Sequence, residues 1–136
     1  MKAKNIVPTL KYFDAKKAIK WLCDTWGFSD HLIVVGPDDT VAHAQLILGD
    51  IMIMLGSVDD GEHGKLINQP ADNGGRVTQA PYMVVDDPDW FYERARRAGA
   101  KILIEIKDED YGGRGFTCSD IEGHIWNFGS YDPFAK

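Results

Sequence analysis

The reactive side chains of this sequence do not fall into a catalytic spacing. No Gly-x-Ser-x-Gly motif is present, and no serine or cysteine has a histidine at local spacing. Cys23 and Cys118 lie far apart without a Cys-x-x-Cys pair, so we interpret them as reduced thiols in the core of a cytoplasmic protein. Nucleophilic catalysis is therefore not what these residues predict.

The four histidines favour structural roles over a shared site. His43 lies in an apolar strand, and we expect it to face the helices as a hydrogen-bonded core residue. His124 stands beside a turn that it would fix, and His31 and His63 are expected to be exposed. The adjacent pair Glu62-His63 offers two metal-ligating side chains, which alone do not make a metal site.

Acidic residues gather in the turns Asp59-Asp60, Asp86-Asp87 and Asp108-Glu109-Asp110. We interpret them as turn and cap residues, because a carboxylate acting as a general base needs burial to raise its pKa. The run Gly112-Gly113-Arg114-Gly115 follows an acidic loop and does not open a helix, so it predicts no phosphate site.

Asn127 is the one polar residue inside an apolar strand, which follows the turn Asp120-Ile121-Glu122-Gly123. Its neighbours Ile125, Trp126 and Phe128 have high β propensity. A buried amide without a partner costs ~1–3 kcal/mol, so Asn127 should find one in protein, water or ligand. We predict that Asn127 is the polar anchor of a ligand site.

Composition sets the class of protein in which these residues stand. The chain has 136 residues, of which 44% are hydrophobic and 26% charged, as in an ordinary globular domain. Its net charge of −6 argues against nucleic acid as a partner. No apolar run approaches the ~18 residues of a membrane span, so we expect no membrane partner.

Two helices and eight strands are predicted. A helix over 15–26 begins at the N-cap Asp14 and ends at Gly27, and a second over 88–98 begins at Asp87 and ends at Gly99. Strands are predicted over 5–13, 31–35, 41–48, 51–55, 80–85 and 101–106, and on both sides of the turn at 120–123. The strands 41–48 and 51–55 form a hairpin around Gly49-Asp50.

The same element order, β-α-β-β-β, occurs twice. Pro8 and Pro81 are 73 residues apart, as are Asp14 and Asp87, while Gly49 and Gly123 are 74 apart. Such a constant offset indicates an internal duplication. We predict an α+β fold of duplicated units, with curled mixed sheets around a cleft. The prediction is a single domain (1–136) with repeat units 5–56 and 79–131 joined by the connection 57–78.

This doubled pattern resembles the vicinal oxygen chelate superfamily, which includes glyoxalase I, extradiol dioxygenases and bleomycin-resistance proteins. The likeness is carried by Tyr12-Phe13-Asp14-Ala15 at the first helix and Asp120-Ile121-Glu122-Gly123-His124 before the last strand. The segments Val41-Ala42-His43-Ala44-Gln45-Leu46 and Trp126-Asn127-Phe128-Gly129-Ser130-Tyr131 are similar to small bacterial glyoxalase-like or bleomycin-resistance-like members.

The resemblance also implies where a divalent metal would bind, at one residue in the first and one in the last strand of each unit. Carried over by register, these positions are Val7, Ile53, Ala80 and Asn127. Three of the four have no ligating atom, and an asparagine is a weak neutral ligand. We therefore expect no metal cofactor at the inherited site.

An apolar cleft with Asn127 as its hydrogen-bonding point is the expected alternative to a metal site. Pairing Leu48 with Ile51 places Ala44, Leu46, Ile53 and Leu55 on one face, which we assign to the cleft. Aromatic residues would border it, and Trp126 and Phe128 would face the helices. The predicted ligand-binding residues are Val7, Thr9, Leu46, Ile53, Ala80, Tyr82, Trp90, Tyr111 and Asn127.

Three functions stay open at this point. The first is a metal-free binding protein that sequesters a small aromatic, hydrophobic or antibiotic-like compound. The second is a glyoxalase-like lyase, isomerase or dioxygenase with a divergent metal site, and the third is an accessory module. A homodimer is expected, because small duplicated units expose apolar edges unless they pair with a second copy.

Overall fold

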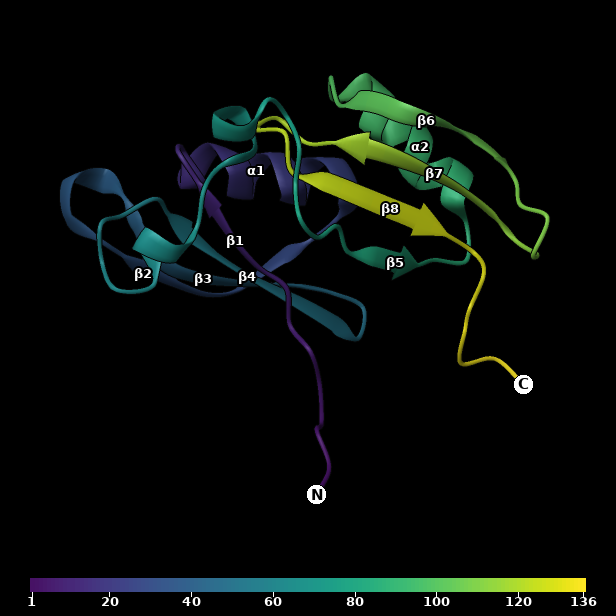
Figure 1. The fold of residues 1–136 in the computed structure, drawn as a ribbon, viewed down its shortest axis with the longest axis horizontal. Coiled ribbons are helices and arrows are strands. Elements are labelled where there is room, and N and C mark those ends of the chain that lie inside the picture. Colours follow the sequence, from purple (N-terminus) through teal and green to yellow (C-terminus); the bar gives the residue numbers. More distant parts are fainter. The chain divides into compact units, whose positions relative to one another are not determined.

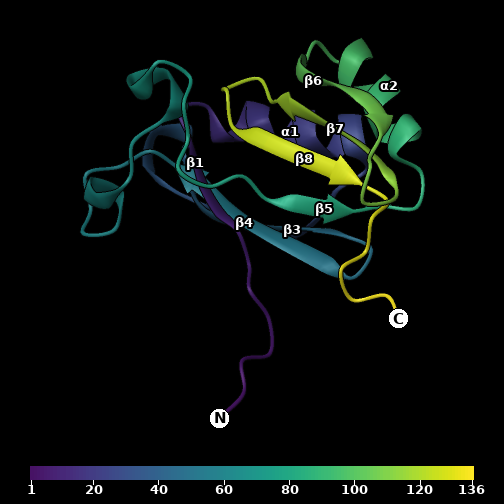
Figure 2. The ribbon, with the colours of Figure 1, turned by 45° about the vertical axis from the view of Figure 1, so that its right-hand side comes forward.

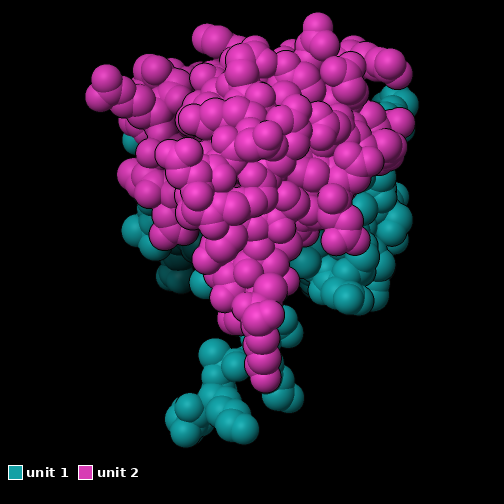
Figure 3. Space-filling model, turned by 90° about the vertical axis from the view of Figure 1, so that its right-hand side faces the viewer, with its two compact units in different colours: residues 1–69 teal, residues 70–136 magenta.

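A computed structural model describes residues 1–136, and the chain divides into two compact units, Met1–Gln69 and Pro70–Lys136 (Figure 3). Each unit contains a four-stranded mixed sheet and one α-helix, in the order strand, helix, three strands (Figure 1). The predicted α+β fold of duplicated units is therefore confirmed. The division lies within the predicted connection, which carries the short 3₁₀ helices η2 (Gly64–Leu66) and η3 (Pro70–Asn73).

The first unit contains β1 (Thr9–Tyr12), α1 (Ala15–Trp26), β2 (Ser29–Val35), η1 (Pro37–Asp39), β3 (Val41–Leu48) and β4 (Ile51–Ser57). The strands lie in the order β1-β4-β3-β2, with β1 parallel to β4 and the other pairs antiparallel. Leu48 lies opposite Ile51, as predicted for a hairpin with the two-residue loop Gly49-Asp50.

Helix α1 has the predicted bounds because both of its ends carry strong signals. The Asp14 carboxylate accepts a hydrogen bond of 3.1 Å from Lys17 N, and Gly27 ends the helix in the left-handed region with a φ of +86°. The apolar stripe is buried against β1, β3 and β4. Its buried members are Ala15, Ala18, Ile19, Leu22 and Trp26.

The predicted cleft face of the first unit is wrong, although the predicted strand pairing is right. Leu46 and Ile53 are only 0% and 1% exposed, and with Ala44 and Leu55 they form the core face of the sheet. His43 and Gln45 lie on the opposite face and are half-buried. His43 therefore does not face the helix.

A one-residue slip between the repeats explains this error. Met54 N donates to Pro8 O at 2.9 Å, and Asn127 N donates to Pro81 O at 3.0 Å. Asn127 and Pro81 each lie 73 residues after their counterparts, so the equivalent of Asn127 is Met54 rather than Ile53. Because side chains alternate along a strand, a slip of one residue moves the whole set to the other face.

The second unit contains β5 (Tyr82–Val84), α2 (Pro88–Arg97), β6 (Lys101–Asp108), β7 (Arg114–Ser119) and β8 (Ile125–Gly129). Its strand order is β5-β8-β7-β6, and Figure 2 shows β8 between β5 and β7. β5 is parallel to β8, while the other pairs are antiparallel. Asp87 caps α2 by accepting a hydrogen bond of 3.2 Å from Trp90 N.

Aromatic rings fill the space between α2 and its sheet. Phe91 of α2 stacks on Phe128 with ring centroids 5.2 Å apart, and Phe128 stacks on Phe116 at 5.0 Å. Tyr92 meets Phe116 edge-on at 5.3 Å. The prediction that Trp126 and Phe128 point away from the face of Asn127 is confirmed, since both are 1% exposed on the helix-covered face.

Asp120 fixes the turn between β7 and β8. Its carboxylate accepts hydrogen bonds from Glu122 N at 3.0 Å, His124 N at 3.1 Å and Trp126 Nε1 at 3.0 Å. Only 6% of Asp120 is exposed, so these three donors hold a nearly buried charge. The turn therefore sets the position of β8 and of Asn127 within it.

Neither helix has the length and apolar character that a membrane span requires.

Candidate functional site

The open face of the second sheet, opposite α2, is hollowed into a concavity of about 270 Å³. Thr117 and Asn127 lie side by side on its floor, on paired strands. The lining also contains three tyrosines and three charged residues: Tyr82, Tyr111, Tyr131, Lys107, Glu109 and Arg114. We define these residues with Thr117 and Asn127 as the tyrosine concavity.

Gly115 and Gly129 leave this face of the sheet without side chains at two paired positions. A Cβ at Gly115 would lie 3.2 Å from Gly129 Cα and closer still to Phe128 O, and a Cβ at Gly129 would lie 2.8 Å from Tyr82 Cε1. The Tyr82 ring therefore lies directly on the backbone of Gly129, in space that any side chain at 129 would take. The absence of side chains at 115 and 129 is what makes the sheet concave here.

The three tyrosines contact one another in a chain. Tyr82 Oη donates a hydrogen bond of 2.7 Å to Tyr131 O, and the rings of Tyr111 and Tyr131 meet edge-on with centroids 5.1 Å apart. Burial raises the pKa of Tyr82, and the nearby Tyr111, Tyr131 and Asp132 raise it further. Tyr82 is therefore a neutral phenol at physiological pH, able to present its ring and accept hydrogen bonds.

Asn127 has partners within the protein. Its Oδ1 accepts a hydrogen bond of 2.6 Å from the Thr117 hydroxyl, and its Nδ2 donates to Pro81 O at 3.4 Å. The second hydrogen of the amide group remains available, since an asparagine NH₂ carries two donors. Asn127 is half-buried, so this amide can both fix the floor of the concavity and offer a donor to a ligand.

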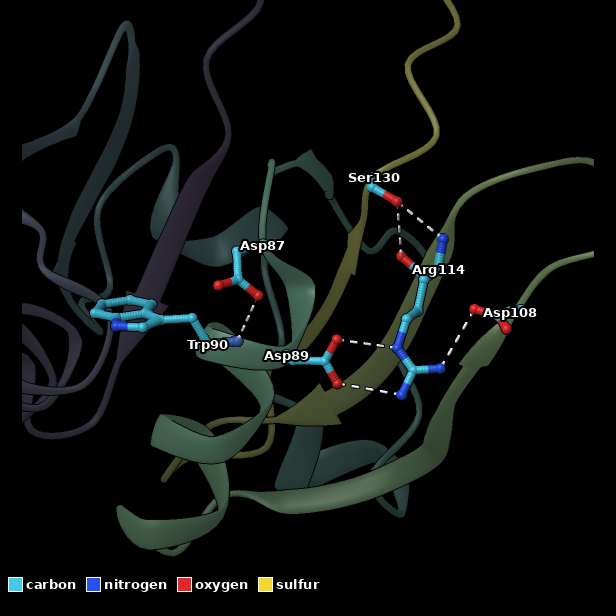
Figure 4. A network of polar contacts seen from close by, with 6 residues as sticks. All are labelled: Asp87, Asp89, Trp90, Asp108, Arg114 and Ser130. Atoms are coloured by element: carbon cyan, nitrogen blue, oxygen red, sulfur yellow. Dashed lines mark hydrogen bonds and ion pairs between the residues drawn. The ribbon is translucent and has the colours of Figure 1, made fainter.

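A network around Arg114 holds the strands that carry the concavity (Figure 4). The guanidinium donates to both carboxylate oxygens of Asp89 on α2, at 3.0 and 3.2 Å, and to Asp108 on β6 at 3.4 Å. The Ser130 hydroxyl accepts from Arg114 N at 2.9 Å. Asp89 and Asp108 thus balance the charge of Arg114, and the ends of β6 and β7 are tied to the helix.

The first unit has a smaller concavity of about 130 Å³ on its open face, lined in part by Thr9, Lys11, His43, Met54 and His63. Lys11 is paired with Asp59 at 2.9 Å. The equivalent of Asn127 is Met54, so this face lacks the amide of the second unit. It also lacks the tyrosines, which makes it the poorer candidate.

The residues that the sequence predicted as one site belong to both units of the chain. Tyr82, Tyr111 and Asn127 come together in the tyrosine concavity, whereas Thr9 lies in the concavity of the first unit. Val7 and Ala80 precede β1 and β5 and line neither concavity. Leu46 and Ile53 are core residues, as described above.

Trp90 also corrects the sequence prediction. It lies on α2, which covers the face opposite Asn127, and its ring packs edge-on against Phe91 with the Arg94 guanidinium 4.7 Å from its centroid. Trp90 therefore does not border the concavity of its own unit. Sequence reasoning missed Thr117 and Tyr131, whose signal was their alternation with core residues on β7 and their position just after β8.

The residues at the inherited metal positions do not fit a metal ion. The hydrogen bonds from Met54 N to Pro8 O and from Asn127 N to Pro81 O correct the register between the repeats. The inherited positions are then Val7, Met54, Ala80 and Asn127. Only an amide and a thioether are available there, and the amide is bonded to Thr117. No three His, Cys, Asp or Glu side chains come close enough together to hold a metal.

Comparison with known proteins places this fold among its relatives. The family model of the Glyoxalase/Bleomycin resistance protein/Dioxygenase superfamily matches residues 9–128. TioX from Micromonospora sp. ML1 has a solved structure with a TM-score of 0.72 and 28% identity, covering 93% of this chain and 98% of TioX.

Two further matches are a solved structure with low sequence identity and a relative found by its sequence. The fosfomycin resistance protein FosX from Mesorhizobium loti has a TM-score of 0.68 at 16% identity, covering 98% of this chain and 96% of FosX, and this likeness concerns the fold alone. The uncharacterized protein Mb0911c of Mycobacterium bovis is 29% identical over 122 residues, which are 90% of this chain and 80% of the relative.

Proposed function

The chain belongs to the glyoxalase/bleomycin resistance protein/dioxygenase superfamily, and from this premise we propose that it is a cytoplasmic, metal-free protein that binds and sequesters a small aromatic or antibiotic-like compound. The observation that carries the proposal is the tyrosine concavity. It combines three exposed rings with a fixed amide on its floor. Such a surface suits a planar organic molecule better than a metal ion.

The energetics of the concavity support a ring-shaped ligand. Tyr82, Tyr111 and Tyr131 are 42%, 64% and 40% exposed, so a ligand that covers them removes apolar ring surface from water. Ring contacts add ~0.5–1.5 kcal/mol each beyond area burial. The volume of about 270 Å³ is near the lower end of small-molecule sites, which sets the size of the part that binds here.

The polar groups of the concavity would orient the bound ligand. The second hydrogen of the Asn127 amide is available to an acceptor on the ligand, and the Tyr82 hydroxyl already donates to Tyr131 O. A ligand group that pairs with Asn127 therefore gains one hydrogen bond without breaking another. This contribution is ~0.5–1.5 kcal/mol for a neutral pair.

Metal analysis combined with thermal shift tests the proposal. The purified protein should contain no stoichiometric zinc, nickel, cobalt, iron or manganese. Tryptophol, a neutral indole alcohol, should raise the melting temperature equally before and after treatment with EDTA. At ten times its Kd, a ligand stabilises the folded state by about 1.4 kcal/mol, which is a shift of roughly 3–5 °C for a chain of this size.

Tightly bound stoichiometric metal, or a tryptophol effect that disappears with EDTA, would overturn the metal-free proposal. Either result would favour the enzyme alternative, a glyoxalase-like lyase, isomerase or dioxygenase with ligands outside the inherited positions.

A further inference from the structure

We propose that the tyrosine concavity selects cationic ligands, namely aromatic or hydrophobic molecules that carry an amine or ammonium group. This inference rests on the proposed function and names the chemical class of ligand that the same site prefers. It is carried by the tyrosine rings together with the balance of charges around them.

The rings provide the first half of the preference. The face of an aromatic ring carries negative partial charge, so a cation within about 6 Å of the centroid is attracted by ~0.5–1 kcal/mol at an exposed site and by more when water is excluded. Tyr111 and Tyr131 meet edge-on, which turns their ring planes about a right angle to each other, at 88°. Tyr82 is the third tyrosine of the lining, so a compact cation can face more than one ring plane.

The charges provide the second half. Glu109 lines the concavity, and Asp132 lies near enough to Tyr82 to raise the pKa of its phenol. The guanidinium of Arg114 is balanced by Asp89 and Asp108. Lys107 and Glu109 are then the remaining charged residues of the lining, and Asp132, next to Tyr131 in the chain, adds a carboxylate near Tyr82.

Glu109 is also held in place by its backbone. Glu109 N donates to Gly113 O at 2.9 Å, and Gly112 N donates to Glu109 O at 3.0 Å, so the loop that carries both Glu109 and Tyr111 is closed by two hydrogen bonds. The carboxylate and the Tyr111 ring therefore approach the ligand from one ordered loop. Because the backbone of this loop is already ordered, binding costs less entropy than it would with a mobile loop.

Calorimetric titration with three indole probes tests the inference. Tryptamine is cationic, tryptophol is its neutral alcohol counterpart, and indole-3-propionate is anionic. We expect tryptamine to bind about ten-fold more tightly than tryptophol, which corresponds to about 1.4 kcal/mol, and indole-3-propionate to bind most weakly. Added salt should reduce the advantage of tryptamine, because it screens the carboxylates.

Two variants assign the preference to the site. Glu109→Gln should lower the tryptamine-to-tryptophol affinity ratio at least three-fold. Glu93→Gln is the matched control: it removes a carboxylate that pairs with Arg96 on α2, on the opposite side of the sheet, and should leave the ratio unchanged. Melting temperatures of both variants establish that they fold.

The outcomes separate this inference from the proposed function. Equal binding of the three probes, or tightest binding of indole-3-propionate, overturns the cation preference and leaves the binding function standing. Absence of saturable heat with all three probes overturns both. A ratio that Glu109→Gln does not change overturns the role of Glu109.

Discussion

Thr117 and Asn127 lie opposite each other on β7 and β8, and the Thr117 hydroxyl donates a hydrogen bond of 2.6 Å to Asn127 Oδ1. This contact orients the amide so that its Nδ2 points toward Pro81 O and the concavity. The amide that stood out in the sequence is therefore held by a neighbouring strand on the floor of the concavity.

Thr117→Val should lower the free energy of unfolding by ~1 kcal/mol, because it keeps the shape of the side chain and leaves Asn127 Oδ1 without its donor. Urea denaturation measures the change. Thr9→Val is the matched control, since Thr9 is an exposed threonine of the first unit, and it should stay within ~0.5 kcal/mol of wild type.

Asn127→Ala should weaken tryptophol binding roughly ten-fold, about 1–2 kcal/mol, and should also lower stability by ~1 kcal/mol through the lost bond to Thr117. Isothermal calorimetry and urea denaturation measure the two effects. A variant with full affinity and reduced stability would show that Asn127 serves only the protein.

Leu46→Ala and Ile53→Ala should each lower the free energy of unfolding by ~2–5 kcal/mol, because both side chains are buried against the face that α1 covers. Tryptophol affinity should not change. Ile51→Ala is the control, at 42% exposure, and should cost less than ~1 kcal/mol. Little loss of stability at Leu46 or Ile53 would restore them as cleft residues.

The wrong assignment of Leu46 and Ile53 shows which features of the fold the sequence predicts: those set by local signals, and not the register of parallel strands. Helix α1 was predictable to its ends because Asp14 and Gly27 act locally, and the β3–β4 hairpin because a two-residue loop fixes its register. By contrast, tertiary contacts set the register in which β1 and β5 pair with the last strand of their units. In β4, the residue opposite Thr9 is Met54, three residues after the first residue of the strand, Ile51. In β8, the residue opposite Tyr82 is Asn127, only two residues after the first residue, Ile125.

That difference is invisible in the spacing of Gly49 and Gly123, which mark the turns and not the parallel pairing. The same limit applies to Trp90, whose helical position was predictable but whose face was not assigned. Tyr131 escaped prediction because it follows the last strand and reaches the concavity through its contacts with Tyr82 and Tyr111.

The stability of the protein should fall at alkaline pH through Cys118. Burial raises the pKa of this thiol to about 12, with Asp120 adding to the effect. Because the folded-state pKa lies above the ordinary value of 9.0, the stabilisation is complete below pH 9 and is lost as the pH rises toward 12. The melting temperature of wild type should therefore fall more steeply above pH 9 than that of Cys118→Ala, and parallel curves would contradict this.

The exposed strand β2 predicts a homodimer. It is an edge strand of its sheet, and Leu32, Ile33, Val34 and Val35 are 44%, 38%, 44% and 65% exposed. An apolar edge of this kind is a template for pairing with a second copy. Light scattering should show a dimer at micromolar concentrations that Val34→Lys converts to monomer, while the control Val58→Lys leaves it intact. A monomeric wild type would refute the prediction.

Amide NMR spectra of EDTA-treated protein, recorded during titration with tryptophol, test the central claim most directly. The signals of Tyr82, Gly115, Gly129 and the Asn127 side chain should shift together and saturate with a single Kd, since all four line the tyrosine concavity. Shifts confined to Thr9 and Gly56 in the first unit, or shifts that appear only after a divalent metal is added, would contradict a metal-free aromatic site in the second unit.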